Sequence, residues 1–155
     1  PRDEVMSPEA PAKADVPGPM LLAPLWPRFG AIVYESVLLF GITFLASWIF
    51  VTTIGDATIG PMRFVFRGYL FAVIGVYFVF CWRRTGQTLA MKTWGLRLRG
   101  PDGRAISLPA SIARYTLAVV SATCAGAGFL WAFVDRDRQF LHDRLLGTRI
   151  VRAPI

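Results

Sequence analysis

The chain has 155 residues and a formal net charge of +7, and 54% of its residues are hydrophobic against 17% that are charged. A mean hydropathy of +0.48, contributed by long apolar runs rather than by amphipathic spacing, excludes an ordinary soluble domain and indicates a membrane protein. The basic residues stand beside the apolar runs. We therefore attribute them to membrane topology and to contact with anionic lipid headgroups, and we expect no nucleic-acid partner.

The N-terminal part of the chain predicts a tail followed by two membrane spans. Residues 1–24 are rich in Pro and Ala, have little apolar surface to bury and are expected to be flexible. Residues 25–51 and 64–82 are each long enough to cross a bilayer, which takes about 20 apolar residues. Trp26 suits the headgroup level and Pro27 suits the first turn of a helix, so the first span is expected to begin there.

The segment after the second span is strongly basic. Residues 83–114 hold seven Lys and Arg side chains and a single acidic one. Residues 89–98 fit an amphipathic helix on the membrane or, in part, a strand, and the alternation of Leu and Arg over residues 96–99 favours a short strand. Residues 106–108 could return beside it after a turn. We expect instead a small two-stranded element that pairs residues 96–99 with residues 148–152.

The distribution of Lys and Arg predicts the orientation in the membrane. The link over residues 52–62 has no Lys or Arg, whereas the segment over residues 83–114 has seven. Loops that face the cytoplasm carry an excess of basic residues. We therefore expect the link to lie outside, and the N-terminus and the basic loop to lie in the cytoplasm.

The third apolar run, residues 111–134, leaves two arrangements open. Five arginines follow it within about 20 residues, and a plain third span would place them outside, against the charge rule. A re-entrant hairpin broken near Gly126 and Gly128 would keep them inside, and the pairing of residues 96–99 with residues 148–152 requires it. The length alone favours the plain span. The fold expected is an all-α membrane protein with two to three transmembrane helices, a basic cytoplasmic loop and a small two-stranded element.

Two ionisable residues mark the first span. Glu35 lies inside it, where a carboxylate costs about 2.5–3.5 kcal/mol and therefore needs a partner or a function. Arg28 lies at its mouth, seven residues earlier on the same helical face, and is either a topological anchor or a partner of Glu35 or Asp143. His142 is the only histidine, so no metal site is expected. The sequence fits no catalytic or cofactor-binding motif, so we expect neither an enzyme nor a cofactor.

Three short motifs follow one another along the chain. They are a Pro-Arg-Phe-Gly-Ala sequence with Arg28 followed by Glu35, a Gly-Gln-Thr sequence at Gly86, Gln87 and Thr88, and the pair His142 and Asp143. Together they resemble the RDD family of membrane proteins, named for one arginine and two aspartates, over residues 26–151. The resemblance implies a transmembrane domain over residues 25–155.

The resemblance also implies which residues form a site. By position, the family's arginine is Arg28 and its second aspartate is Asp143, while its first aspartate is replaced by Glu35, which is one methylene longer. These three residues would bind a ligand or ion, or form a charge clasp. Supporting roles would fall to Gly86, Gln87, Thr88 and His142.

The family has been linked to transport of unidentified ligands and, in some members, to sodium/proton exchange. The function expected is therefore a small transporter or cation/proton antiporter unit in the bacterial inner membrane. Because two or three spans are too few to enclose a pathway, the unit would act as a homo-oligomer. The alternative is a non-transporting accessory or assembly subunit that packs against a larger membrane complex. A water-filled cavity at Glu35 would favour transport, and a dry, salt-bridged interior would favour the charge clasp.

Overall fold

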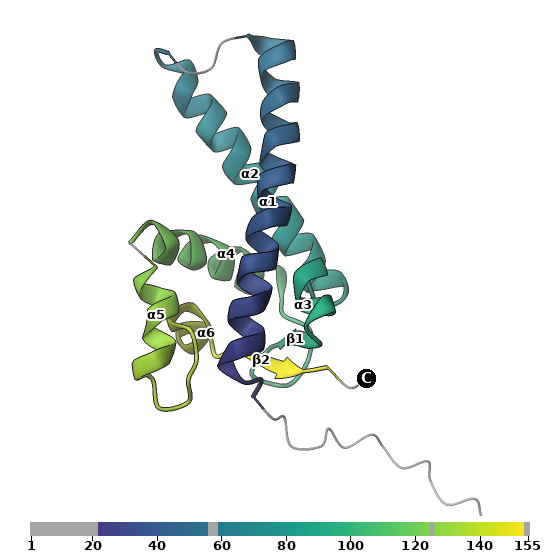
Figure 1. Cartoon of the computed structure of the whole chain (residues 1–155), viewed down its shortest axis with the longest axis vertical. Coiled ribbons are helices and arrows are strands. Elements are labelled where there is room, and N and C mark those ends of the chain that lie inside the picture. Colours follow the sequence, from purple (N-terminus) through teal and green to yellow (C-terminus); the bar gives the residue numbers. More distant parts are fainter. Residues whose placement is uncertain (1–21, 56–58, 125, 154–155) are drawn as a thin grey trace, which may run out of the picture.

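The computed structural model describes residues 22–55, 59–124 and 126–153 of the chain. In chain order these residues form α1 (Leu25–Ile54), α2 (Met62–Arg84), α3 (Leu89–Thr93), β1 (Leu96–Arg99), α4 (Leu108–Thr123), α5 (Ala127–Val134), α6 (Leu141–Leu146) and β2 (Arg149–Arg152). Figure 1 shows the far ends of α1 and α2 rising above a lower body that holds the other elements. The mostly helical fold with a small two-stranded element is as predicted. Most of the predicted tail, residues 1–21, lies outside the described residues.

The two long helices are the predicted membrane spans. α1 and α2 are each long and apolar enough to cross a membrane. With 30 residues at about 1.5 Å each, α1 is about 45 Å long, which exceeds the roughly 30 Å of a hydrocarbon core. It ends at Gly55, whose φ of 103° breaks the helix while its N–H still bonds to the carbonyl of Val51. α1 is therefore long enough to reach the headgroup level on both sides, with some tilt.

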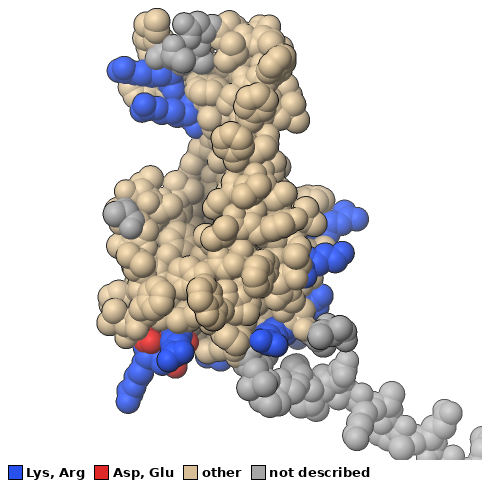
Figure 2. Space-filling view, in the orientation of Figure 1, with Lys and Arg blue, Asp and Glu red and all other residues tan. Residues whose placement is uncertain are grey.

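Beyond the lower body, the two spans present apolar side chains outward. Phe50 packs on Phe66 and on Tyr69, with ring centroids 5.1 Å apart in both pairs. Large apolar residues such as Phe40 and Phe64 are exposed on the same helices. On the face drawn in Figure 2, this upper part is free of charged side chains except for basic ones near its far end. An apolar surface of this extent suits contact with lipid.

The two short strands pair as the sequence predicts. β1 and β2 lie antiparallel, with Leu96 opposite Arg152. Ala23, which the sequence placed in the tail, joins them by donating its N–H to the carbonyl of Ile150 at 3.0 Å. The other partner considered, residues 106–108, contributes no strand, since α4 begins within it. Of residues 89–98, for which the sequence allowed a helix or in part a strand, the first five form the short helix α3 and the last three belong to β1.

The third apolar run is bent rather than straight. α4 and α5 lie at 92° to each other across a short break. Gly126 stands there with a φ of 74°, a left-handed conformation that favours glycine. α5 comes so near α4 that a Cβ on Gly128 would lie 2.1 Å from the Ser121 Oγ. The straight span that the length favoured is not formed. Because β1 pairs with β2, both ends of the run lie at one end of the molecule, as a re-entrant segment requires.

The hydrophobic core lies in the lower body. Trp82 near the end of α2, Leu96 on β1 and Tyr115 on α4 are buried together with Phe140, which precedes α6. Tyr115 also donates its hydroxyl to the carbonyl of Phe71 at 2.8 Å, which fastens α4 to α2. The N-terminal half of α1 and the C-terminal half of α2 thus provide most of the packing between the spans and the lower body.

Candidate functional site

A cavity of about 430 Å³ lies within the lower body, between α1, α2, α4 and the C-terminal elements. Most of its wall is apolar, and its polar side chains include Arg28, Glu35, Ser36, Thr88, Arg114 and His142. The structure thus brings Arg28, Glu35, Thr88 and His142 of the predicted site to one cavity. The other three predicted residues, Gly86, Gln87 and Asp143, are not part of its wall.

Glu35 is buried among hydroxyl groups rather than beside a cation. Only 8% of its surface is exposed. The Tyr77 hydroxyl of α2 donates to Glu35 Oε1 at 2.6 Å, and the Thr88 hydroxyl donates to Oε2. No Lys, Arg or His nitrogen of the described residues lies within 4.0 Å of the carboxylate. Of the alternatives left open by the sequence, an ion pair between Arg28 and Glu35 is therefore not formed.

The Gly-Gln-Thr motif connects the end of α2 to α3 and β1. Gly86, with a φ of 70°, accepts the N–H of Leu98 on its carbonyl at 2.7 Å, and a Cβ there would lie 3.0 Å from the Leu98 carbonyl oxygen. Gln87 Nε2 donates to the carbonyl of Leu96 at 2.6 Å. Thr88 caps α3 by accepting an N–H of its first turn at 3.2 Å. The motif therefore fixes β1 and α3, and through Thr88 it holds the carboxylate of α1.

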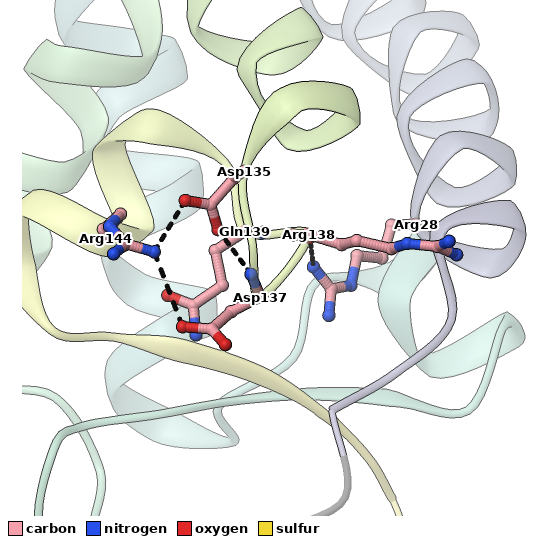
Figure 3. Close-up of polar contacts among 6 residues, drawn as sticks. All are labelled: Arg28, Asp135, Asp137, Arg138, Gln139 and Arg144. Carbon is pink, nitrogen blue, oxygen red and sulfur yellow. Dashed lines mark hydrogen bonds and ion pairs between the residues drawn. The ribbon is translucent and has the colours of Figure 1, made fainter.

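Arg28 fastens α1 to the loop between α5 and α6. Its side chain is 3% exposed, and Nη1 donates to the carbonyl of Arg138 at 2.7 Å. In Figure 3 this contact lies beside a second one, in which Arg144 Nη1 bridges Asp135 at 2.6 Å and Asp137 at 3.4 Å. The guanidinium of Arg28 is thus hydrogen-bonded to a backbone carbonyl. No direct ion pair with Asp143, the second alternative from the sequence, is formed among the described residues.

Asp143 belongs to a buried ion pair. Its carboxylate accepts from Arg114 Nε at 2.8 Å and from the Thr148 hydroxyl at 2.9 Å, and its side chain is 2% exposed. The guanidinium of Arg114 also lies over the Trp82 ring, 4.3 Å from its centroid. Burial by itself would raise the pKa of Asp143, but the Arg114 charge and the hydrogen bonds hold that pKa below its usual value. Asp143 is thus a fixed negative charge that ties α6 to α4.

His142 is neutral and packed among aromatic rings. It stacks on Phe140 and meets the edge of Phe129, with ring centroids 5.6 and 5.2 Å away. Burial lowers the pKa of His142 from 6.5 to about 4, against the attraction of Asp143. The 3.9 Å approach of its Nε2 to the Asp143 carboxylate is therefore a contact of a neutral ring near pH 7, and not an ion pair.

Three buried nitrogens on the cavity wall have no hydrogen-bond partner among the described residues. They are Arg28 Nε, Trp82 Nε1 and His142 Nδ1. Buried N–H groups normally find a partner, so these three nitrogens are exceptions in the wall around the cavity. Within the described part of the chain, no three His, Cys, Asp or Glu side chains gather to hold a metal ion.

The sequence reasoning missed two residues of the site. By its place in the sequence Arg114 belongs to the basic segment over residues 83–114, yet only 5% of it is exposed. The signal was present, because Arg114 lies inside the third apolar run and an ionisable residue there needs a partner, by the reasoning that selected Glu35. Tyr77 offered no comparable signal, since a tyrosine in an apolar span is most simply a packing residue.

The comparison with known proteins agrees with this architecture. The model of the RDD family matches residues 22–147, most of the chain, and the matched range includes Arg28, Glu35, the Gly-Gln-Thr motif and Asp143. Neither the curated proteins nor the solved structures contain a match. With two membrane-capable helices and a family match over this range, the chain belongs to the RDD family and is an integral membrane protein.

Proposed function

We propose that this protein is a membrane transport unit in which Glu35 takes up and releases a proton beside the cavity of the lower body. The observation that carries the proposal is the setting of Glu35. It is a buried carboxylate in a membrane span, it lines a cavity of about 430 Å³, and its two hydrogen-bond partners are hydroxyls. An ionisable group at this position in a span is most simply explained by a function.

Hydroxyl partners suit a group that changes its protonation state. A hydroxyl donates to a carboxylate and, after rotating, accepts from a protonated carboxyl, so Tyr77 and Thr88 can serve Glu35 in both states. An ion pair cannot do this, because protonating the acid leaves a buried cation unpaired at a cost of about 3–5 kcal/mol. Asp143, paired with Arg114, is in that second situation. We therefore assign the proton to Glu35 and a structural role to Asp143.

The proposed unit is a homo-oligomer in a bacterial inner membrane. Two long spans and one bent run are too few to enclose a pathway, so neighbouring copies would complete it. Seven basic residues in the segment over residues 83–114, against none in the link over residues 52–62, support a cytoplasmic N-terminus and lower body. We propose a transport role and no catalytic one.

Flux measurements on reconstituted protein test this proposal. The full chain is placed in vesicles that contain a pH-sensitive dye, and proton movement is followed after sodium or potassium gradients are imposed. The parent protein should move protons, Glu35→Gln should abolish the flux at an unchanged melting temperature, and Glu35→Asp, which restores the family's usual residue, should keep it. Parental flux in Glu35→Gln would contradict the proposal.

The alternative, an accessory subunit that packs against a larger membrane complex, is favoured by a different observation. Two of the three charged residues at the family's motif positions stabilise the fold. Arg28 donates to the Arg138 carbonyl, and Asp143 pairs with Arg114. If Glu35 also acted only as a clasp, the parent would show no flux and Glu35→Gln would melt at a lower temperature, as Asp143→Asn should in either case. The same set of variants therefore separates the two functions.

A further inference from the structure

A second cavity, of about 680 Å³, opens on the other side of the Gly-Gln-Thr motif, against the last turn of α2, α3 and β1. We call it the basic groove, because its lining holds five basic side chains and no acidic one: Arg83, Arg84, Lys92, Arg97 and Arg99. Gly86 and Gln87, which lie away from the first cavity, line this one. In Figure 2 blue side chains follow the right flank of the lower part, beside α3 and β1, and red ones are seen only at the lower left.

The cations of the basic groove have no counter-charge among the described residues. The ion pairs of the described chain involve Arg114, His142 and Arg144, and none involves a residue of the groove. The Nε atom of Arg97 is buried and has no hydrogen-bond partner within the same residues. Like charges gathered on one surface repel one another and attract an anion. The groove is therefore complementary to a negatively charged group.

The backbone holds the groove in place without a ligand. β1 is fixed on one side by its pairing with β2 and on the other by the Leu98 N–H, which donates to the Gly86 carbonyl at 2.7 Å. Gln87 adds its bond to the Leu96 carbonyl at 2.6 Å. A site whose backbone is already ordered binds a ligand more tightly, because less conformational entropy is lost on binding.

The position of the groove indicates where its anion comes from. Arg83 and Arg84 are the last two residues of α2, so the groove begins where a membrane span ends. Leu89 lines it and is 53% exposed, and Trp94, at the end of α3, is 45% exposed. Exposed leucine and tryptophan beside basic residues at a span end are typical of the headgroup level. We infer that the basic groove binds the phosphate of an anionic phospholipid headgroup, with Leu89 at the boundary to the acyl chains.

Competition between two lipids tests this inference. The full chain is reconstituted in nanodiscs of equal parts phosphatidylglycerol and phosphatidylcholine, and native mass spectrometry counts the lipids that remain on the released protein. The parent should retain phosphatidylglycerol preferentially. Replacing Arg97 and Arg99 by Gln should lower this preference about 25-fold. Each basic residue near an anionic surface contributes roughly a factor of five, and two are removed. The matched control, Arg104→Gln with Arg152→Gln, removes the same charge outside the groove and should leave the preference unchanged.

Three results would overturn the inference. The first is an unaltered lipid preference in the Arg97 and Arg99 variant, and the second is an equal loss in the control, which would show that net charge alone attracts the lipid. The third is displacement of phosphatidylglycerol by excess inorganic phosphate, which would make the groove a site for a soluble anion. Should the β1 variant fail to fold, Arg83→Gln with Lys92→Gln repeats the test on exposed helical positions.

Discussion

At the scale of single residues, the two acidic residues at the family's aspartate positions, Glu35 and Asp143, have different hydrogen-bond partners. Glu35 is held by hydroxyls beside a cavity, whereas Asp143 is held by Arg114 and Thr148 in a buried pair. Negative charge on Asp143 is needed to keep Arg114 satisfied. Charge on Glu35 is not needed by any neighbouring cation of the described residues. For this reason we propose that Glu35 exchanges a proton and that Asp143 stabilises the fold.

His142 predicts a pH dependence of stability. Its pKa is lowered from 6.5 to about 4, so between these values the unfolded chain binds more protons than the folded one. The free energy of unfolding should therefore fall as the pH falls from 7 to 4.5, by roughly 2 kcal/mol at about 1.4 kcal/mol per pKa unit, because part of the shift lies below this range. Asp143, whose pKa is also lowered, stabilises the fold above its ordinary pKa of 3.8 and loses that contribution only at lower pH, outside this window.

Thermal unfolding of the full chain, measured at steps between pH 7 and pH 4.5, checks this. In His142→Gln, which has no titrating ring, the melting temperature should vary much less with pH than in the parent, whatever its absolute value. Parallel curves for the two proteins would show that another group is responsible.

At the scale of elements, the bend between α4 and α5 depends on two glycines. Gly126 provides the left-handed residue, and Gly128 lets the helices approach so closely that a Cβ would lie 2.1 Å from the Ser121 Oγ. The bend returns the chain toward α6 and β2, and it places the loop that accepts Arg28 beside α1. The packing of Gly128 is therefore a condition for the site.

Gly128→Ala should destabilise the protein. Inserting a methyl group into a packed contact costs about 1–3 kcal/mol, which a lower melting temperature would report. Ser121→Gly should restore stability in the double variant, because it removes the two side-chain atoms nearest to the new Cβ. Gly41→Ala is the control, since a Cβ there meets nothing within 4 Å, and its melting temperature should not fall. Equal melting temperatures for Gly128→Ala and the parent would refute the close approach.

Some of these elements could be predicted from the sequence, for local reasons. An apolar run of span length predicts a membrane helix, and α1 and α2 confirm it. The Leu and Arg alternation predicted β1, its pairing with residues 148–152 was predicted separately, and the glycines marked where the third run breaks. The partners of the charges could not be predicted, because Tyr77 stands 42 residues from Glu35 and Arg114 stands 29 from Asp143. Which distant side chains meet is decided by packing in three dimensions, and no spacing along the chain reports it.

At the scale of the whole molecule, the pairing of β1 with β2 determines topology. It brings the basic loop and the C-terminal strand to one end of the protein, opposite the C-terminal end of α1 and the N-terminal end of α2 (Figure 1). Together with the charge distribution, this places the lower body, its cavity and the basic groove at the cytoplasmic surface in our proposal.

Cysteine labelling in intact cells tests this topology. In a background where the free cysteines Cys81 and Cys124 are replaced by Ala, Ile59→Cys should react with an impermeant reagent, and Ser107→Cys and Arg152→Cys should not. Opposite accessibility of the Ser107 and Arg152 positions would exclude the β1–β2 pairing. If the Ser107 and Arg152 positions both react and the Ile59 position does not, the β1–β2 pairing stands but the orientation in the membrane is the reverse of the one proposed.

The most direct measurement is whether Glu35 gains a proton inside the folded protein. Infrared difference spectra of the reconstituted full chain, recorded between two pH values, report the carbonyl stretch of a protonated carboxyl group. We predict a carboxyl band in the parent that is missing from Glu35→Gln and displaced in Glu35→Asp. Superimposable difference spectra for the parent and Glu35→Gln, with both proteins folded, would contradict a proton-exchanging role for Glu35.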